Sequence, residues 1–319
     1  MAELEFVSVA STSDASELKP SIGTSVDPAF ATELVHQHEQ AGFAAVLAND
    51  SSSSADAAAL AGQLLTASST IRVLVTERPG VSAPTAVARQ LATLAAFHPG
   101  RVGVHIPAVD SDREAARDGD WLDRASRQRR RVEYADILHR CWTSDRPFDV
   151  DGEFYRLANT WTPLRPKHPI PFYASGMSVQ ADEFGARYAD VYCLPAMPAA
   201  LVGARIAAVR AMAADRGRAL RVALRLRPVL APTRAAAVRL ADRIARIQST
   251  ASLDEATGAV AGLGSLVGTT AEVAATIETY LALGVDSLRL VAWQPHEDVA
   301  LHAELIARLR EATARRRAG

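Results

Sequence analysis

Short runs of β-branched and aliphatic residues alternate with alanine-rich amphipathic stretches along the whole 319-residue chain. Runs of about four to eight such residues are typical of strands, whereas longer amphipathic stretches are typical of helices. Eight strands that are each followed by a helix fit a closed (β/α)8 TIM barrel better than an open sheet. Because barrels of this length form one unit, we predict a single α/β domain over residues 1–319.

The expected elements can be placed by their residue ranges. The strands are Phe6–Ala10, Ala44–Ala48, Ile71–Thr76, Val102–Ile106, Ile170–Ala174, Asp190–Cys193, Val222–Leu230 and Ser287–Val291. The helices lie near 28–41, 55–66, 84–97, 126–142, 179–188, 200–214, 233–247, 270–283 and 298–314. The sequence contains no GxGxxG and no P-loop motif, which argues against dinucleotide-binding and P-loop folds.

Three insertions interrupt the alternation, after strand four, before strand five and after strand seven. Residues 107–125 are charged and rich in turn formers, and residues 143–169 contain the hairpin-like segment VDGEFYRL. Residues 249–267 are rich in Ser, Gly and Ala. Because the active sites of TIM barrels form from loops at the carboxyl ends of strands, these insertions predict a lid or pocket wall. For residues 249–267 a plain linker is an equal alternative.

Charge and cysteine usage exclude several classes of function. Lys and Arg number 35 against 36 Asp and Glu, so no bulk attraction to nucleic acid or to an anionic membrane is expected. Cys141 and Cys193 form no CxxC motif, and no histidine or carboxylate pattern has metal-ligand spacing. We therefore expect no disulfide framework and no metal. Without a secretory signal or an apolar run of transmembrane length, the expected location is the cytoplasm.

One short turn combines hydroxyl groups with glycine at the start of a helix. Ser175-Gly176-Met177-Ser178 follows strand five directly and precedes the helix near 179–188. Backbone N–H groups at a helix N-terminus bind phosphate, and glycine allows close approach of the backbone. The turn is therefore a candidate phosphate cradle, with a simple N-cap role for Ser178 as the alternative.

The segment around this turn, FYASGMSVQADEFGARYADVYCLPAMPA, resembles the phosphate-binding segment of the flavin-dependent luciferase-like monooxygenases. IRVLVTERPGVSAPTAVARQLATLAAFHPGRVGVHI is similar to the third and fourth strand–helix units of that family. The resemblance is closest to the alkanesulfonate monooxygenase branch and runs over nearly the whole chain. It implies a TIM barrel that takes reduced FMN from a separate flavin reductase, uses O2 on a small organic substrate, and assembles as a homodimer or homotetramer.

The resemblance also implies where the cofactor binds. Ser175, Gly176, Met177 and Ser178 would hold the FMN phosphate. A second phosphate contact of the family, a tyrosine, corresponds to Gln128 beside Arg127, where glutamine can donate a hydrogen bond and arginine can supply charge. Thr76 and His105 are further expected contacts of the flavin.

The chain departs from the alkanesulfonate branch at the residues that carry its chemistry. Its cysteine falls on Ser54, its strand-seven histidine on Arg227, its tyrosine after strand eight on Trp293, its tryptophan after strand six on Pro195, and its strand-four asparagine on His105. A sulfonate is therefore no more strongly implied than another metabolite or a natural-product intermediate. Ser54 and Trp293 stay on the list of candidate catalytic residues.

Arg225 and Arg227 alternate with Leu224 and Leu226, so both arginines face one side of a strand. At the barrel mouth they would stabilise an anionic substrate, the oxygenated flavin or a reduced flavin anion. Alternatively, both face outward and pair with carboxylates. His105 ends strand four, where it would donate to the flavin ring or act as a general acid or base, unless it is a core histidine.

The sequence thus predicts an FMN-dependent two-component monooxygenase. Two alternatives stay open at this point. One is a barrel that uses the deazaflavin F420 for hydride transfer without oxygen. The other is a flavin-binding barrel that has lost catalysis.

Overall fold

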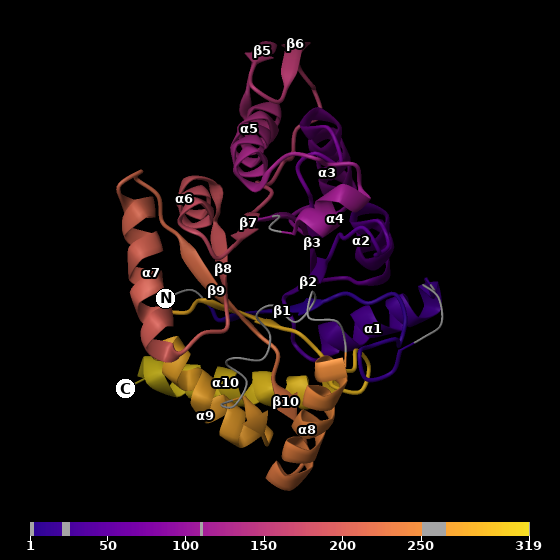
Figure 1. The fold of residues 1–319 in the computed structure, drawn as a ribbon, viewed down its shortest axis with the longest axis vertical. Helices are drawn as coiled ribbons and strands as arrows, with labels where there is room; N and C mark the ends of the chain where they lie inside the picture. Colours follow the sequence, from indigo (N-terminus) through magenta and orange to yellow (C-terminus); the bar gives the residue numbers. More distant parts are fainter. Residues whose placement is uncertain (1–2, 21–25, 109–110, 251–265, 319) are drawn as a thin grey trace.

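A computed structural model of the protein describes residues 3–20, 26–108, 111–250 and 266–318. Eight parallel strands close into a barrel in the order β1-β12-β9-β8-β7-β4-β3-β2, with helices around it (Figure 1). The (β/α)8 prediction is confirmed. The barrel strands are β1 (Glu5–Val9), β2 (Ala45–Ala48), β3 (Arg72–Thr76), β4 (Val102–Pro107), β7 (Phe172–Ser175), β8 (Val191–Pro195), β9 (Arg221–Leu226) and β12 (Ser287–Leu290).

Apart from the short helix α4, which lies in the insertion after strand four where no helix was predicted, the helices form where the amphipathic stretches predict them. Several begin at a side-chain cap, such as Asp27 before α1 and Thr269 before α9, where Glu272 completes a capping box. The helices are α1 (Pro28–Gln40), α2 (Ala57–Ala67), α3 (Pro84–Phe97), α4 (Asp112–Arg117), α5 (Arg124–Thr143), α6 (Val179–Tyr188), α7 (Ala199–Ala214), α8 (Arg234–Thr250), α9 (Thr270–Ala282) and α10 (Val299–Ala318).

Strand seven is shorter than the sequence suggests. The expected run Val222–Leu230 divides into β9, which ends at Leu226, and β10 (Val229–Leu230), which pairs with β11 (Val267–Gly268) outside the barrel. Pro228 lies between the two pieces and has no N–H to donate to a neighbouring strand, so the barrel pairing stops there.

The insertions have the expected positions in the chain. The one before strand five contains an antiparallel hairpin of β5 (Phe148–Asp151) and β6 (Arg156–Thr160), which extends beyond the end of α5 (Figure 1). The one after strand four contains the short helix α4. Most of the third, residues 249–267, lies outside the described residues, so the lid prediction is not addressed by the structure.

The barrel interior is built in layers that follow from strand alternation. Glu5 lies at the amino-terminal end, where it accepts a hydrogen bond from Tyr173 at 3.0 Å and contacts Arg72 at 3.1 Å and Arg221 at 3.3 Å. The next inward positions are apolar and include Val7, Leu47, Leu74, Cys193 and Ala223. This plug closes the barrel, so the following inward positions form the floor of a cavity at the carboxyl end.

Two histidines are buried in the contact between α1 and α10. His38 and His302 are only 4% and 2% exposed, and His38 lies 3.0 Å from the Ser8 hydroxyl. Burial lowers the pKa of His38 to about 3, with a further contribution from His302, and burial lowers the pKa of His302 to about 4. Both side chains are therefore neutral in the folded protein at physiological pH.

These histidines predict a loss of stability in mild acid. In the unfolded chain each takes up a proton near pH 6.5, whereas the folded protein resists protonation, so stability present above pH 6.5 is lost as the pH falls below it. Replacing His302 by leucine should reduce the drop in unfolding free energy between pH 7.5 and 5 by about 2 kcal/mol. Urea unfolding at the two pH values measures this drop in unfolding free energy. His139→Gln, which replaces an exposed histidine, is the control. Equal drops in wild type and His302→Leu would contradict the assignment.

Candidate active site

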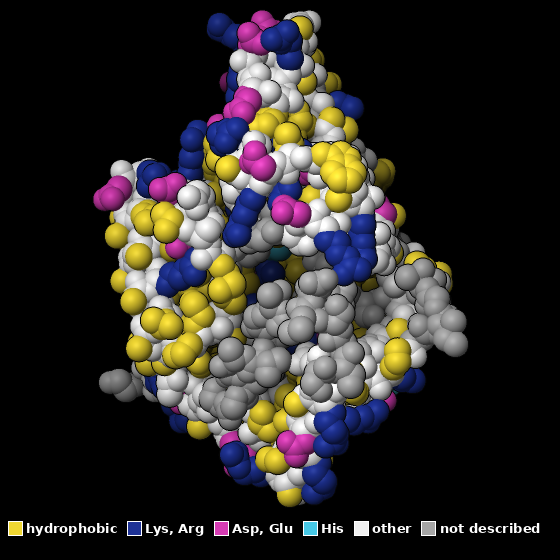
Figure 2. Space-filling view, in the orientation of Figure 1, with side chains coloured by type: hydrophobic (Ala, Val, Ile, Leu, Met, Phe, Trp, Pro, Cys, Tyr) yellow, Lys and Arg dark blue, Asp and Glu magenta, His cyan; other side chains and the backbone are white. Residues whose placement is uncertain are grey.

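The carboxyl ends of the barrel strands surround a cavity of about 430 Å³, which we call the mouth cavity. Its polar lining comes from the ends of five strands, namely Asn49, His105, Ser175, Arg225 together with Arg227, and Arg289. Figure 2 looks into this hollow, where a histidine and basic side chains are visible in its depth. A second cavity of about 710 Å³ adjoins it at Val9 and Asn49. The space is large enough for a cofactor together with a small substrate.

His105 lies at the centre of a short hydrogen-bonded chain in the cavity wall. Its Nδ1 is 3.3 Å from the Thr76 hydroxyl and its Nε2 is 3.0 Å from the Ser175 hydroxyl. Burial, together with the cations Arg289 and Arg131, lowers the pKa of His105 well below its usual value. The ring is therefore neutral, with one N–H to donate and one nitrogen to accept. This arrangement can orient Ser175 or relay a proton.

Arg225 and Arg227 both line the mouth cavity, but only Arg227 has an ion-pair partner among the described residues. Arg227 pairs with Glu17 at 2.7 Å, and its guanidinium lies 3.5 Å from the centre of the Trp293 ring. The Arg225 side chain faces the cavity. Burial and the nearby Arg289 and Arg227 lower the pKa of Arg225, while the Cys193 thiol acts in the opposite direction.

Arg289 is a site residue that the sequence reasoning missed. It faces the same cavity from β12, and it is the register partner of Arg225 on the neighbouring strand β9. Its side chain is buried, with the residue only 5% exposed. The signal was present in the sequence, because Leu-Arg-Leu occurs both at 224–226 and at 288–290, each time with the arginine on the inward face.

The other replaced family positions lie around this cavity. Pro195 lines it, while Ser54 lines the adjoining cavity and donates to backbone oxygens of its own loop, including that of Ser51 at 3.2 Å. Trp293 is 1% exposed, packs against Arg227 and beside Leu18, and does not line the mouth cavity.

The turn from Ser175 to Ser178 connects the mouth cavity to the N-terminus of α6. The Ser178 hydroxyl accepts from the backbone N–H of Ala181 at 3.2 Å, so Ser178 is at least the N-cap. A Cβ on Gly176 would lie 2.3 Å from the Cβ of Ala181, so only glycine fits this close approach. Tyr192 donates to the Gly176 carbonyl at 3.1 Å and fixes the turn. Met177, at 60% exposed, projects toward solvent.

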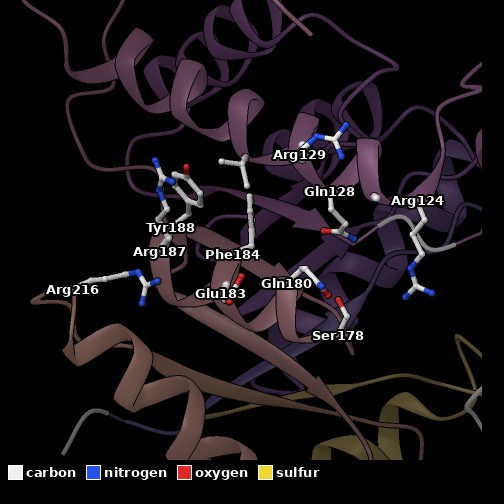
Figure 3. Close-up of a pocket in the computed structure, with 12 residues that line it drawn as sticks. Arg124, Gln128, Arg129, Ser178, Gln180, Glu183, Phe184, Arg187, Tyr188 and Arg216 are labelled. Atoms are coloured by element: carbon white, nitrogen blue, oxygen red, sulfur yellow. The ribbon is translucent and has the colours of Figure 1, made fainter. Parts of the chain in front are cut away.

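Outside the barrel, α5 and α6 enclose a larger cavity of about 790 Å³. Gln128 and Ser178 both line it, and in Figure 3 the Gln128 side chain points toward Ser178 and Gln180. Arg127 is not among its lining residues, because its buried guanidinium pairs with Asp112 and donates to the carbonyl of Leu122. The structure thus brings Gln128 to the turn but directs Arg127 elsewhere.

The described residues form neither a cluster of metal-binding side chains nor a helix that could cross a membrane. Among residues 3–20, 26–108, 111–250 and 266–318, no group of at least three His, Cys, Asp or Glu side chains is arranged to bind a metal ion. None of the helices in those ranges combines the length and the apolar character that crossing a bilayer would require.

A closed eight-stranded barrel with its polar groups at the carboxyl strand ends defines the TIM-barrel class of enzymes. Residues 6–287 match the family model described as luciferase-like monooxygenase. The chain belongs to the luciferase-like monooxygenase family, a family of flavin-dependent monooxygenases.

Several solved structures share the fold at low sequence identity. An F420-dependent secondary alcohol dehydrogenase in complex with an F420–acetone adduct is 20% identical, with a TM-score of 0.77 over 97% of this chain and 99% of that one. EDTA monooxygenase from Chelativorans sp. BNC1 is 16% identical, with a TM-score of 0.80 over 99% and 94%. DmoA from Hyphomicrobium sulfonivorans is 15% identical, with a TM-score of 0.78 over 98% and 88%. These similarities do not single out the alkanesulfonate branch.

Proposed function

We propose that the protein is a two-component monooxygenase that receives reduced FMN from a separate flavin reductase and uses O2 to oxidise a small organic substrate in the mouth cavity. One observation carries the proposal. Ser175 lines the mouth cavity, where its hydroxyl is hydrogen-bonded to His105. The same residue begins the turn that leads into α6. A single ligand with a phosphate and a flat ring could therefore reach from the α6 N-terminus into the cavity.

The residues present fit such a ligand. The turn supplies the glycine approach at Gly176, the Ser178 hydroxyl and the N-terminal end of a ten-residue helix, all of which suit a phosphate. Gln128 adds an amide donor from α5. The mouth cavity supplies polar groups on one wall, from His105 and Ser175, for the edge of a ring.

When bound, reduced flavin supplies the two electrons that O2 activation needs. The chain's own part is to orient the reactants and to provide fixed charge. His105, held between Thr76 and Ser175, offers a neutral hydrogen bond at a defined position. Arg225 supplies positive charge that is already in place before reaction, so no solvent has to reorganise around it.

F420-dependent hydride transfer is the second candidate. It is favoured by the fold similarity over nearly the full length of both chains to the F420-dependent secondary alcohol dehydrogenase. The two candidates differ in the flavin that the mouth accepts and in the need for O2, so the retained cofactor and the oxygen requirement separate them.

The phosphate cradle is tested by Ser178→Asp. Aspartate is as good an N-cap as serine, so the helix should persist, but its charge repels a phosphate. We expect the affinity for reduced FMN to fall at least 10-fold while that for reduced riboflavin, which has no phosphate, stays within about threefold, as measured by anaerobic fluorescence titration. An equal loss for both ligands, or no loss for either, would show that Ser178 only caps the helix.

A further inference from the structure

The barrel interior contains two pairs of arginines whose charges are balanced differently. In the lower layer, Arg72 and Arg221 both contact the carboxylate of Glu5. In the upper layer, Arg225 and Arg289 are register partners on the adjacent strands β9 and β12. Each lies two residues beyond the apolar plug, toward the carboxyl end of its strand. Within the described part of the chain, neither of these two side chains has a hydrogen bond or an ion pair. We call Arg225 and Arg289 the arginine pair.

Arg289 is the more unusual member of the arginine pair because it is buried. The residue is 5% exposed, and its Nε has no hydrogen-bond partner among the described residues. A buried charge is unfavourable unless an opposite charge or a set of hydrogen bonds compensates it. Arg221, on the same strand as Arg225 and with the same inward orientation, shows that this barrel can supply a carboxylate where it needs one.

The side chains around the arginine pair do not neutralise its positive charge, so a bound anionic ligand would do so. The mouth cavity is lined by Arg225, Arg227 and Arg289, and its described lining contains no Asp or Glu. Glu17 is engaged by Arg227 at 2.7 Å on the rim. His105, the other titratable group of the wall, is neutral because burial and nearby cations lower its pKa. Among the described residues, no carboxylate compensates the positive charge of Arg225 and Arg289 at the floor of this cavity.

We infer that the arginine pair binds the anionic group of the substrate, a carboxylate, sulfonate or phosphate, so that the oxidised substrate is an organic acid. This inference rests on the proposed function. Guanidinium groups suit such anions because their planar N–H donors match two oxygens at once. A reduced flavin anion is a second source of the same charge, and the experiment below distinguishes the two.

The test uses the flavin-free protein with sodium methanesulfonate and sodium acetate as probes, at constant ionic strength. Calorimetric titration and thermal unfolding should show that wild type binds at least one probe and is stabilised by it. In Arg289→Met the affinity should fall at least 10-fold and the stabilisation should disappear, whereas Arg289→Lys should retain part of both. Without a probe, Arg289→Met should melt no lower than wild type, because an uncompensated buried charge has been removed.

Arg221→Met is the matched control, since it removes an inward arginine of β9 that already has a carboxylate partner. It should lower the melting temperature and leave probe affinity within threefold, and Arg72→Met replaces it if it does not fold. Unchanged probe binding in Arg289→Met, or no probe binding by wild type, would overturn the inference.

A second titration, with reduced FMN under anaerobic conditions, identifies the source of the anion. Affinity within threefold of wild type in Arg289→Met assigns the pair to the substrate. A loss of 10-fold or more assigns the pair to the flavin and overturns the inference. Probe binding without any flavin binding would instead contradict the proposed function and leave the anion site in place, so the two failures are distinguishable.

Discussion

Replacing Arg225 by methionine should lower kcat/KM roughly 100-fold or more, while reduced FMN binds within a few-fold of wild type. The reason is that Arg225 opens into the mouth cavity and has no carboxylate partner among the described residues, so its charge is available to the reactants. Losing one preorganised charge of this kind is worth about 3 kcal/mol, whereas methionine preserves the bulk of the side chain. A steady-state assay coupled to a flavin reductase measures the effect.

Arg227→Met serves as the control for this prediction. Arg227 is engaged by Glu17 and stacks on Trp293, so its loss should act mainly on stability and change kcat/KM less than 10-fold. If Arg225→Met lowered only the melting temperature, or if both variants lost turnover equally, Arg225 would have no special role in the reaction.

His105→Leu should also reduce turnover, by about 100-fold. His105 links Thr76 to Ser175, and leucine leaves both hydroxyls without this partner in a buried wall. A positioned proton donor or acceptor contributes roughly 100-fold or more to rate. The assay is kcat at saturating reduced FMN, with thermal unfolding to confirm that the variant is folded. Thr76→Val, which removes one of the two hydroxyl groups that orient the ring, should lower kcat about 10-fold.

The pH profile distinguishes a functional from a merely structural His105. Because burial and the cations Arg289 and Arg131 lower the pKa of His105 well below its usual value, the ring stays neutral as the pH falls from 9 to about 6. Wild type should therefore show no loss of kcat from protonation of His105 in this range. If kcat of the wild type fell with an apparent pKa near 6.5, and this fall were absent in His105→Leu, the conclusion that the His105 ring is neutral would be contradicted.

Periodicity and turn chemistry were enough to predict the fold. Strand alternation depends on local pattern alone, and seven of the eight barrel strands match the predicted runs to within about two residues, strand seven being the exception. That exception has a local cause too, because Pro228 separates Val229 and Leu230 from the barrel ladder. The hairpin in the insertion before strand five was likewise visible in its turn sequence.

The site was less predictable because partners come from distant parts of the chain. Arg127 and Arg131 are four residues apart on α5, yet Arg127 binds Asp112, whereas Arg131 donates to the carbonyl of Ile106 at 2.6 Å. The partner of Arg227, Glu17, is 210 positions away in the sequence. Spacing on one element shows which side chains share a face, but it does not show which charge from another element already neutralises them.

Arg289 shows why part of the candidate site could not be predicted from the sequence. Arg289 has the same Leu-Arg-Leu pattern as Arg225, but it matches none of the family positions named in the sequence analysis. The barrel register makes the two arginines neighbours, and that register is a tertiary property.

The cofactor of the mouth cavity is tested most directly by a competition titration of the flavin-free protein with reduced FMN and with reduced F420 under anaerobic conditions. We expect saturable binding of one reduced FMN per chain, at least 10-fold tighter than that of reduced F420 and weakened by Ser178→Asp. Preferential binding of F420, or no binding of reduced FMN, would contradict the assignment of the barrel mouth as the site of an FMN-dependent monooxygenase.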